Sequence, residues 1–106
     1  MSKEKNTASR PWKDYMLDEL KDPKAAQEYL EVAVEEYEAD GDRPAFLLAL
    51  RTVAEAQGGI AELARKSAVS RQHLYRALSE SGNPTFETLT AIFKALGLRF
   101  TVERTA

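Results

Sequence analysis

The feature that most constrains the fold is a tight corner between two short helical patterns in the second half of the chain. Residues 60–66 carry apolar side chains at helical spacing, and a second short helical pattern follows Ser70 and ends near Leu78. Only residues 67–69 separate the two patterns, and Ser70 suits a helix N-cap because its hydroxyl can accept a hydrogen bond from a first-turn amide. Two short helices joined by a three-residue corner have the geometry of a helix-turn-helix unit, whose second helix can enter a groove of DNA.

Small and apolar residues fall where such a unit must pack. Ala64 lies where the first helix approaches the second, Val69 lies at the corner, and Leu74 lies on the inner side of the second helix. Leu78 follows one turn later and extends the same inner face. With these residues turned inward, the 3.6-residue period leaves the polar side chains of the second helix facing outward. The outward residues are Arg71, Gln72, Tyr75, Arg76 and Ser79, with His73 at the edge.

The outward side chains have the chemistry of DNA recognition. Arginine can bind guanine through its O6 and N7 atoms, glutamine can pair with adenine, and serine and asparagine suit phosphate contacts. No aspartate or glutamate lies between residues 65 and 79, as close approach to a polyanion requires. We therefore predict a DNA-binding set that consists of Ser70, Arg71, Gln72, His73, Tyr75, Arg76 and Asn83.

Plainer interpretations of these residues also exist. The two arginines could serve only solubility, Gln72 could be a spacer, and Tyr75 could pack sideways. His73 invites a metal-ligand or general-base interpretation because it is the only histidine. However, the chain has no cysteine, and the helix of His73 has no carboxylate to complete such a site. We therefore expect no metal and no other cofactor.

Charge is distributed unevenly along the chain, although the net charge is only −2. Residues 14–42 carry eleven acidic and two basic side chains, whereas residues 43–106 carry nine basic and five acidic ones. Residues 1–13 carry four basic side chains and one acidic side chain. This segregation indicates two binding surfaces, one for an anion such as DNA and one for a cationic partner. Alternatively, the acidic residues cover a solvated helix face.

Helix start and stop signals divide the chain into three parts. Residues 1–11 have almost no apolar surface and are expected to form a disordered tail. Residues 12–42 are expected to form an N-terminal acidic helical segment, because an aspartate N-cap followed by proline at 22–23 starts an amphipathic helix that is rich in glutamate. Residues 43–106 are expected to form the helix-turn-helix domain. The predicted fold class is all-α, a bundle of about five helices.

The end of the chain carries a last helix and a strand signal. Thr85 begins a helix whose inner face is expected to hold Phe86, Leu89, Ile92, Phe93 and Leu96. Residues 98–103 alternate apolar and polar side chains, which predicts a short C-terminal β-strand. Because a single strand cannot satisfy its own backbone, it needs either another chain or an earlier extended segment as partner.

Several classes of protein are disfavoured. The longest apolar run, residues 45–50, is too short for a membrane span, and the polar N-terminus does not look like a secretory signal, so we expect a cytoplasmic protein. An enzyme with a small-molecule substrate is also not expected. The acidic residues lie on an exposed helix face without a cysteine, a histidine or a glycine-rich loop to complete a site.

Three segments carry a family resemblance: LKDPKAAQEYLEVAVEE at 20–36, IAELARKSAVSRQHLYRALSESGNPTFETL at 60–89 and KALGLRFTVE at 94–103. Through them the chain, from about residue 14 to its end, resembles the HigA-type antidote (antitoxin) proteins of bacterial toxin–antitoxin addiction modules. These proteins have a lambda-repressor-like helix-turn-helix of the Xre/Cro family. The corner of that motif usually has glycine where this chain has Ala68, so a slightly different turn geometry is expected here.

The resemblance implies an antitoxin that forms a homodimer on a palindromic operator in double-stranded DNA and represses its own operon. It also implies a cognate partner, a basic toxin with a RelE-like fold. By position, Ser70, Arg71 and Gln72, together with Arg76, match residues that commonly contact DNA in such domains. The alternative is a stand-alone, phage-derived transcriptional regulator without a toxin, and a neighbouring gene for a small basic protein would favour the antitoxin.

A toxin partner gives the acidic helix a function. Its glutamate face, with the apolar cluster of residues 12–20 before it, could lie against the basic toxin, and Glu28, Glu31 and Glu35 are the predicted toxin-binding residues. Such complementary charge mainly raises the association rate and the selectivity of binding.

Overall fold

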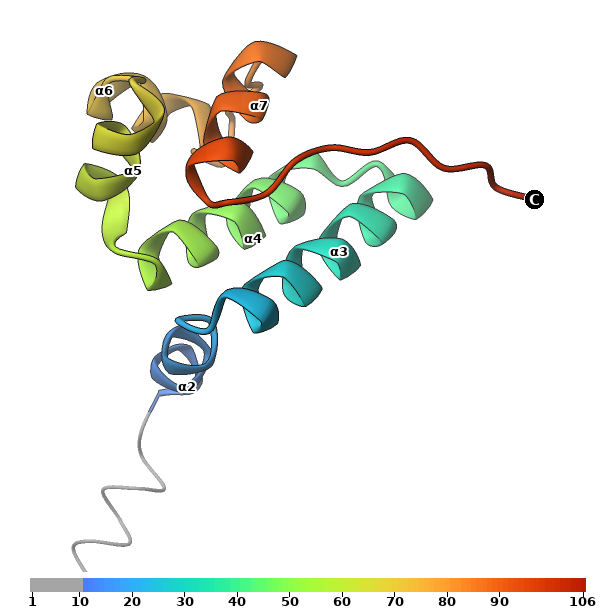
Figure 1. Cartoon of the computed structure of the whole chain (residues 1–106), viewed down its shortest axis with the longest axis horizontal. Coiled ribbons are helices and arrows are strands. Elements are labelled where there is room, and N and C mark those ends of the chain that lie inside the picture. Colours follow the sequence, from blue (N-terminus) through green and yellow to red (C-terminus); the bar gives the residue numbers. More distant parts are fainter. Residues whose placement is uncertain (1–10) are drawn as a thin grey trace, which may run out of the picture.

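The structure is a computed structural model that describes residues 11–106, and within that range it contains α-helices and no β-strand (Figure 1). The described helices are α2 (Trp12–Glu19), α3 (Pro23–Asp40), α4 (Arg43–Ala56), α5 (Gly59–Ser67), α6 (Arg71–Ala77) and α7 (Phe86–Ala95). The predicted all-α class is therefore confirmed, and the Trp12–Glu19 segment adds a sixth helix to the five expected. The predicted tail, residues 1–11, lies outside the described residues except for Pro11.

Side-chain caps begin the helices where the sequence predicts them. The Asp22 carboxylate accepts a hydrogen bond from the Ala25 amide at 3.1 Å at the start of α3. The Asp42 carboxylate accepts one from the Ala45 amide at 3.1 Å at the start of α4. Between them, Gly41 ends α3 in the left-handed conformation with φ of 69°, which a glycine adopts without the strain of a Cβ.

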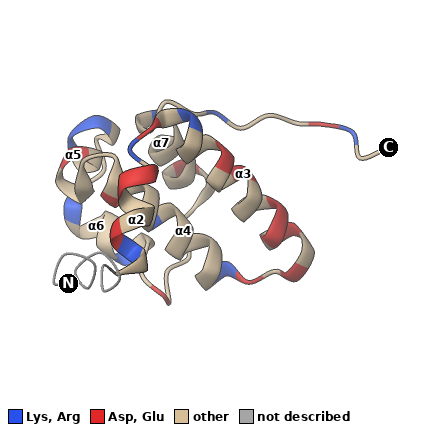
Figure 2. Ribbon diagram, turned by 90° about the horizontal axis from the view of Figure 1, so that it is seen from below, with Lys and Arg blue, Asp and Glu red and all other residues tan. Residues whose placement is uncertain are grey.

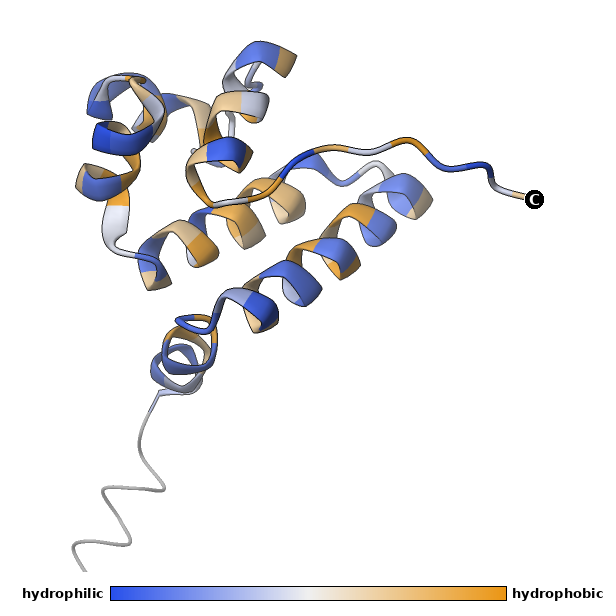
Figure 3. Cartoon of the chain, in the orientation of Figure 1, coloured by the Kyte–Doolittle hydropathy of each residue, from blue (hydrophilic) through white to orange (hydrophobic). Residues whose placement is uncertain are grey.

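The long helix α3 packs along α4, and this is the most extensive contact between two described helices (Figure 1). Ala26, Leu30 and Ala33 of α3 are buried, and the apolar faces of the two helices are turned toward each other (Figure 3). The short α2 also contacts α4, and the Gln57 side chain at the end of α4 donates a hydrogen bond to the Leu20 carbonyl at 2.7 Å. The acidic N-terminal helices are therefore fixed to the central helix α4.

The other side of α4 supports the predicted helix-turn-helix. Helix α5 contacts α4, α6 and α7, and a single cluster of buried side chains runs from α3 through α4 to α7. Leu50 and Val53 of α4, together with Leu74 and Leu78, are fully buried in it. None of the described helices is long and apolar enough to cross a membrane.

Two predictions at the end of the chain are wrong. Residues 98–103 form no strand, because the described part of the chain offers no extended segment beside them and the end of the chain extends away from the bundle (Figure 1). Phe86 does not face the core: it is the first residue of α7, its ring lies beside that of Phe100 in the segment after α7, and it is 70% exposed. Ile92 and Phe93, further along α7, are buried as predicted.

Candidate nucleic-acid and partner interfaces

The corner between α5 and α6 rests on one alanine in an unusual conformation. Ala68 caps α5 with φ of 62° and ψ of 20°, and its amide donates to the Ala64 carbonyl at 3.1 Å. The expectation of a different turn geometry is therefore wrong, because the alanine itself adopts the left-handed conformation that glycine favours. Val69 then packs against the core from the corner, as predicted.

Helix α6 is oriented by a polar cap and an apolar inner face. The Ser70 hydroxyl accepts a hydrogen bond from the His73 amide at 3.1 Å, which confirms Ser70 as the N-cap. Leu74 and Leu78 are completely buried in the core, and Ala77 is buried beside them. The polar side chains consequently face solvent along the opposite side of the helix. The exposed residues of the predicted set on α6 are Arg71, Gln72, His73, Tyr75 and Arg76.

The basic residues of α5 and α6 differ in their partners. On α5, Glu62 forms ion pairs with Arg65 at 2.6 Å and with Lys66 at 3.6 Å. The hydrogen bond from Arg65, supported by the two positive charges, holds the pKa of the Glu62 carboxyl below its usual range. On α6, Arg71 and Arg76 form no ion pair with any described residue. Their positive charge is therefore available to a partner, whereas one of the two positive charges of α5 is compensated by Glu62 within the helix.

The loop after α6 depends on a glycine that packs against the helix. Gly82 is buried, and a Cβ at this position would lie 2.2 Å from the Ala77 carbonyl oxygen. Asn83, the next residue, is exposed beside the end of α6. Ser79 differs from its predicted outward orientation, since it is partly buried and its hydroxyl donates to the Arg76 carbonyl at 2.9 Å.

Arg51 of α4 is a positioning residue that the sequence did not reveal. Its guanidinium donates a hydrogen bond to the carbonyl of Leu78, the residue that caps the C-terminal end of α6. A cation at this end also complements the partial negative charge of the helix terminus. One sign of this role is present in the sequence, because Arg51 follows the buried Leu50 in an otherwise apolar stripe of α4. Its hydrogen-bond partner Leu78, however, is distant in the sequence.

A second surface lies on the opposite, acidic part of the molecule, as the red segments along α3 show in Figure 2. Helices α2 and α3 enclose an open groove of about 540 Å³, here called the α2–α3 groove. Its exposed apolar side chains are Trp12, Tyr15 and Val32, which are 75%, 42% and 51% exposed. The residues that line it are Trp12, Tyr15, Met16, Glu19, Leu20, Ala25, Glu28, Tyr29 and Val32.

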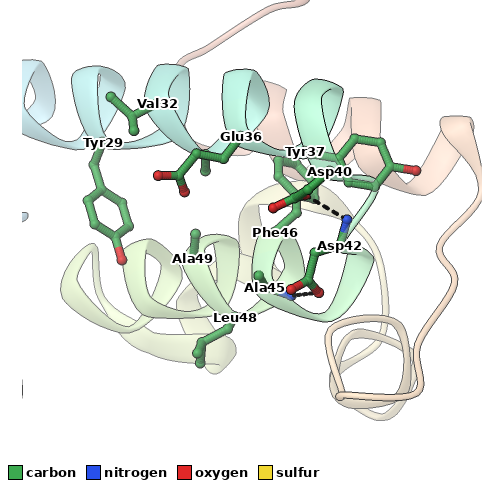
Figure 4. A pocket seen from close by; sticks show the side chains of 11 residues that line it. Tyr29, Val32, Glu36, Tyr37, Asp40, Asp42, Ala45, Phe46, Leu48 and Ala49 are labelled. Carbon is green, nitrogen blue, oxygen red and sulfur yellow. Dashed lines mark hydrogen bonds between the residues drawn. The ribbon is translucent and has the colours of Figure 1, made fainter.

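The same face of α3 continues into a smaller pocket against α4 (Figure 4). Tyr29 and Val32 line both the groove and this pocket, and Glu36 and Asp40 add carboxylates on the α3 side. Partial burial and, after it, the charge of Glu36 raise the pKa of the Tyr29 hydroxyl above its usual value. The face therefore combines exposed apolar side chains with negative charge.

The structure separates the three glutamates that the sequence grouped together. Glu28 lines the α2–α3 groove, whereas Glu31 and Glu35 line neither the groove nor the pocket and are exposed on the outer side of α3. Glu31 accepts a hydrogen bond from the Gln27 side chain at 3.3 Å. The apolar cluster of residues 12–20 was predicted as part of the toxin contact, but the groove around Glu28 was not, because α2 must first fold beside α3 to form it.

No metal site is found among the described residues, since no three side chains of the types that bind metals cluster there. The candidate sites are two surfaces: the exposed face of α6, whose arginines form no ion pair with described residues, and the acidic, partly apolar face of α2 and α3.

Comparison with known proteins connects this architecture to a family. Residues 13–104 match the protein family described as "Probable addiction module antidote protein". A protein of Haemophilus influenzae (strain ATCC 51907 / DSM 11121 / KW20 / Rd), described only as uncharacterized, is 35% identical over 94 residues, which cover 84% of this chain and 96% of that protein. No solved structure matches the chain. Antidotes generally act without catalysis and have a toxin as partner, and this chain belongs to the family of probable addiction module antidote proteins.

Proposed function

We propose that this antidote is the antitoxin of a type II toxin–antitoxin module that also represses its own operon. It binds a basic, RelE-like toxin directly and binds operator DNA through a HigA-type, lambda-repressor-like helix-turn-helix formed by α5 and α6. The observation that carries the DNA-binding part is the outward face of α6, where Arg71 and Arg76 are exposed and form no ion pair with described residues.

The orientation of α6 supports a specific mode of DNA binding. Helix α6 enters the major groove, where Arg71 and Arg76 bind guanine edges and Gln72 pairs with adenine. Ser70 and Asn83 contact phosphates on either side, and His73 and Tyr75 contact the backbone or base edges beside them. A homodimer places two such helices about 34 Å apart, one helical turn, on a palindromic operator.

Operator binding by single variants tests this mechanism. Arg71→Ala and Arg76→Ala are each expected to weaken operator binding by about 1–3 kcal/mol and to relax sequence preference at one position per half-site. Arg43→Ala is a matched control, because it removes the same charge from the exposed start of α4. Footprinting that shows no protected palindrome, or equal losses in all three variants, would contradict the mechanism.

The acidic face of α3 supports the toxin-binding part of the proposal. Negative charge at Glu28, Glu31 and Glu35 attracts the basic toxin and raises the association rate. The exposed aromatic side chains of the α2–α3 groove then supply the desolvated contacts that dominate affinity in most interfaces. We infer that a basic, partly apolar segment of the toxin occupies this groove.

Toxin titrations at low and high salt separate the two contributions. Charge reversal of Glu28, Glu31 and Glu35 to lysine is expected to slow association at low salt, and Trp12→Ala is expected to speed dissociation at any salt. Glu87→Lys on α7 is the control for each single reversal, since one Glu→Lys change shifts the charge equally but lies away from the acidic face. Unchanged affinity of the triple variant at low salt would reject the electrostatic role.

A stand-alone regulator without a toxin is the weaker alternative. Membership of the antidote family favours the antitoxin, and so does the exposed apolar groove, which a regulator without a toxin would not need. Co-purification with the product of the neighbouring gene distinguishes the two.

A further inference from the structure

The segment after α7 is extended but has no partner for its backbone. The Leu98 amide still bonds to the Phe93 carbonyl at 2.8 Å, whereas the backbone groups of residues 99–106 form no backbone hydrogen bond with any described residue. Beyond its contact with α7, the segment extends away from the bundle (Figure 1). Its residues alternate between hydrophobic and hydrophilic (Figure 3), which is the pattern of a strand with one covered face.

One face of this segment is fixed to α7 and remains partly uncovered. The Phe100 ring stacks on the Phe93 ring at 4.5 Å and lies 5.4 Å from the Phe86 ring. Phe86 is 70% exposed and Val102 is 99% exposed, although both are apolar. An extended backbone with free hydrogen-bonding groups beside exposed apolar side chains is an open strand edge, which can pair with another chain.

We propose that the occupant of this edge is the same segment of a second copy, paired antiparallel about a two-fold axis at Thr101. The inference rests on the homodimer of the proposed function and specifies how that dimer forms. Such pairing is isologous, because each residue meets the partner's residue at the mirrored position about the axis.

The sequence around Thr101 is self-complementary in this register. Thr101 lies opposite the same residue of the second copy, and Phe100 lies opposite Val102 of that copy. Arg99 lies opposite Glu103 and therefore forms an ion pair on each side of the axis. Threonine pairs, aromatic pairs with β-branched residues and opposite charges are the cross-strand combinations that stabilise antiparallel sheets.

Neighbouring registers lose this complementarity. An axis at Phe100 or at Val102 keeps the apolar face but separates Arg99 from Glu103. An axis between residues 101 and 102 places Arg99 opposite Arg104 and turns apolar residues toward polar ones. The register with Thr101 on the axis is therefore the one in which charge and hydropathy agree.

Pairing also covers the exposed apolar side chains. Leu98, Phe100 and Val102 lie on one face of an extended chain, and Leu98 and Phe100 already contact the α7 region of their own copy. In the dimer, Val102 of each copy packs beside Phe100 of the other. A two-stranded ribbon is weak by itself, but here the α7 helices of both copies support it.

Cysteine cross-linking tests the register, because the chain has no cysteine of its own. Thr101→Cys places two thiols opposite each other at a Cα separation of about 4.5–5.5 Å, within reach of a disulfide. We expect mild oxidation of the full chain to convert this variant almost completely into a disulfide-linked dimer. Thr105→Cys is the control, because its two thiols would be eight residues apart, about 26 Å along the ribbon.

A charge exchange tests the same pairing without cross-linking. Arg99→Glu creates two like-charge pairs and is expected to weaken dimerisation by about tenfold or more in sedimentation equilibrium. The double variant Arg99→Glu with Glu103→Arg restores opposite charges and should recover the dimer. The inference would be overturned if the protein is monomeric in the absence of DNA and toxin, if both cysteine variants cross-link equally, or if the double variant does not recover the dimer. A monomeric protein is also the outcome expected if a strand of the toxin occupied this edge instead.

These measurements use neither DNA nor toxin, so their failure is distinguishable from a failure of the proposed function. A dimer that cross-links at residue 101 but binds no operator would refute the repressor function alone. Operator binding by a protein that does not cross-link at residue 101 would refute the strand pairing alone.

Discussion

Ala68 stores backbone strain at the corner between α5 and α6. It is the one non-glycine residue with positive φ in the part of the chain that the structure describes. A Cβ in the left-handed region crowds the following carbonyl, which costs about 1–2 kcal/mol. The strain persists because the capping hydrogen bond to Ala64 and the burial of Val69 both require this turn.

Replacing this alanine should therefore stabilise the protein. Ala68→Gly relieves the strain, but glycine raises the conformational entropy of the unfolded chain and so offsets part of this gain. The free energy of unfolding is therefore expected to rise by about 0.5–1 kcal/mol. Chemical denaturation of the two proteins measures the difference. Ala61→Gly, at an exposed position inside α5, is the control and should lower stability by about 1 kcal/mol. A loss of stability in Ala68→Gly would show that the turn differs from the one described.

Gly82 is a residue at which space, not φ, requires glycine. A Cβ there would overlap the Ala77 carbonyl oxygen, at 2.2 Å, where the loop closes on the end of α6. Gly82→Ala is expected to lower the free energy of unfolding by about 1–3 kcal/mol, because the loop must move away from the helix. Gly41→Ala is a useful comparison in thermal melts, since its Cβ would meet no atom within 4 Å and only its positive φ is unfavourable. Equal effects of the two variants would contradict the close packing of the loop.

At the scale of elements, α6 is a short helix that depends on its two ends. Ser70 caps its first turn, and Arg51 of α4 binds the Leu78 carbonyl at its last. Helices this short are not stable by themselves, so tertiary contacts must hold the helix in place. The orientation of the proposed DNA-binding face consequently depends on a residue that lies outside α5 and α6.

Arg51→Met separates this positioning role from direct DNA contact. The variant keeps an aliphatic side chain but removes the guanidinium that donates to the Leu78 carbonyl, so the free energy of unfolding should fall by about 1–3 kcal/mol. Operator affinity should fall with it, but the preferred base sequence should stay the same, whereas Arg71→Ala should change that preference. Arg43→Met is the matched control for thermal melts and operator titration. An unchanged melting temperature in Arg51→Met would rule out the support of α6 by this side chain.

Caps and helical periodicity predicted the helices well, whereas the features that the sequence did not predict depend on contacts between residues far apart in the chain. Caps such as Ser70 and Asp42 act within three residues, so the sequence shows them directly. The partner of Arg51 is 27 residues away, and no local pattern identifies it. The alternation at 98–103 is real, but a strand exists only with a neighbour, and the described chain provides none. Likewise, the helical period placed Phe86 inward, but at the first turn of α7 its ring lies beside Phe100 and stays largely exposed.

At the scale of the whole molecule, the basic and acidic surfaces share one core. The basic face of α6 and the acidic face of α3 lie on different sides of α4, and a continuous buried cluster connects them (Figure 2). Charge counts along the sequence predicted two surfaces because the charges are segregated along the chain. The α2–α3 groove was not predictable in that way, since Trp12 and Tyr29 come together only when α2 folds back beside α3.

This shared core predicts that the acidic segment is part of the folded body and not a detachable arm. The face of α4 toward α3 includes Phe46, whose ring lies 6.0 Å from that of Tyr37, and Ala49, which lines the same pocket as Ala33. A fragment of residues 43–106 would expose this face and lose the burial of Leu30 on α3, and each large buried side chain contributes about 1.5–3 kcal/mol.

Because the total stability of a small domain is only about 5–15 kcal/mol, the fragment is expected to lose its cooperative unfolding transition. Calorimetry and near-UV circular dichroism of the fragment and the full chain measure this directly. Addition of a peptide of residues 12–42 is the control, since it should restore part of the transition by covering α4 again. A fragment that unfolds cooperatively near the melting temperature of the full chain would mean that two independent domains carry the two surfaces. If the transition is lost, toxin and DNA act on one body, and either ligand can change the stability on which binding of the other depends.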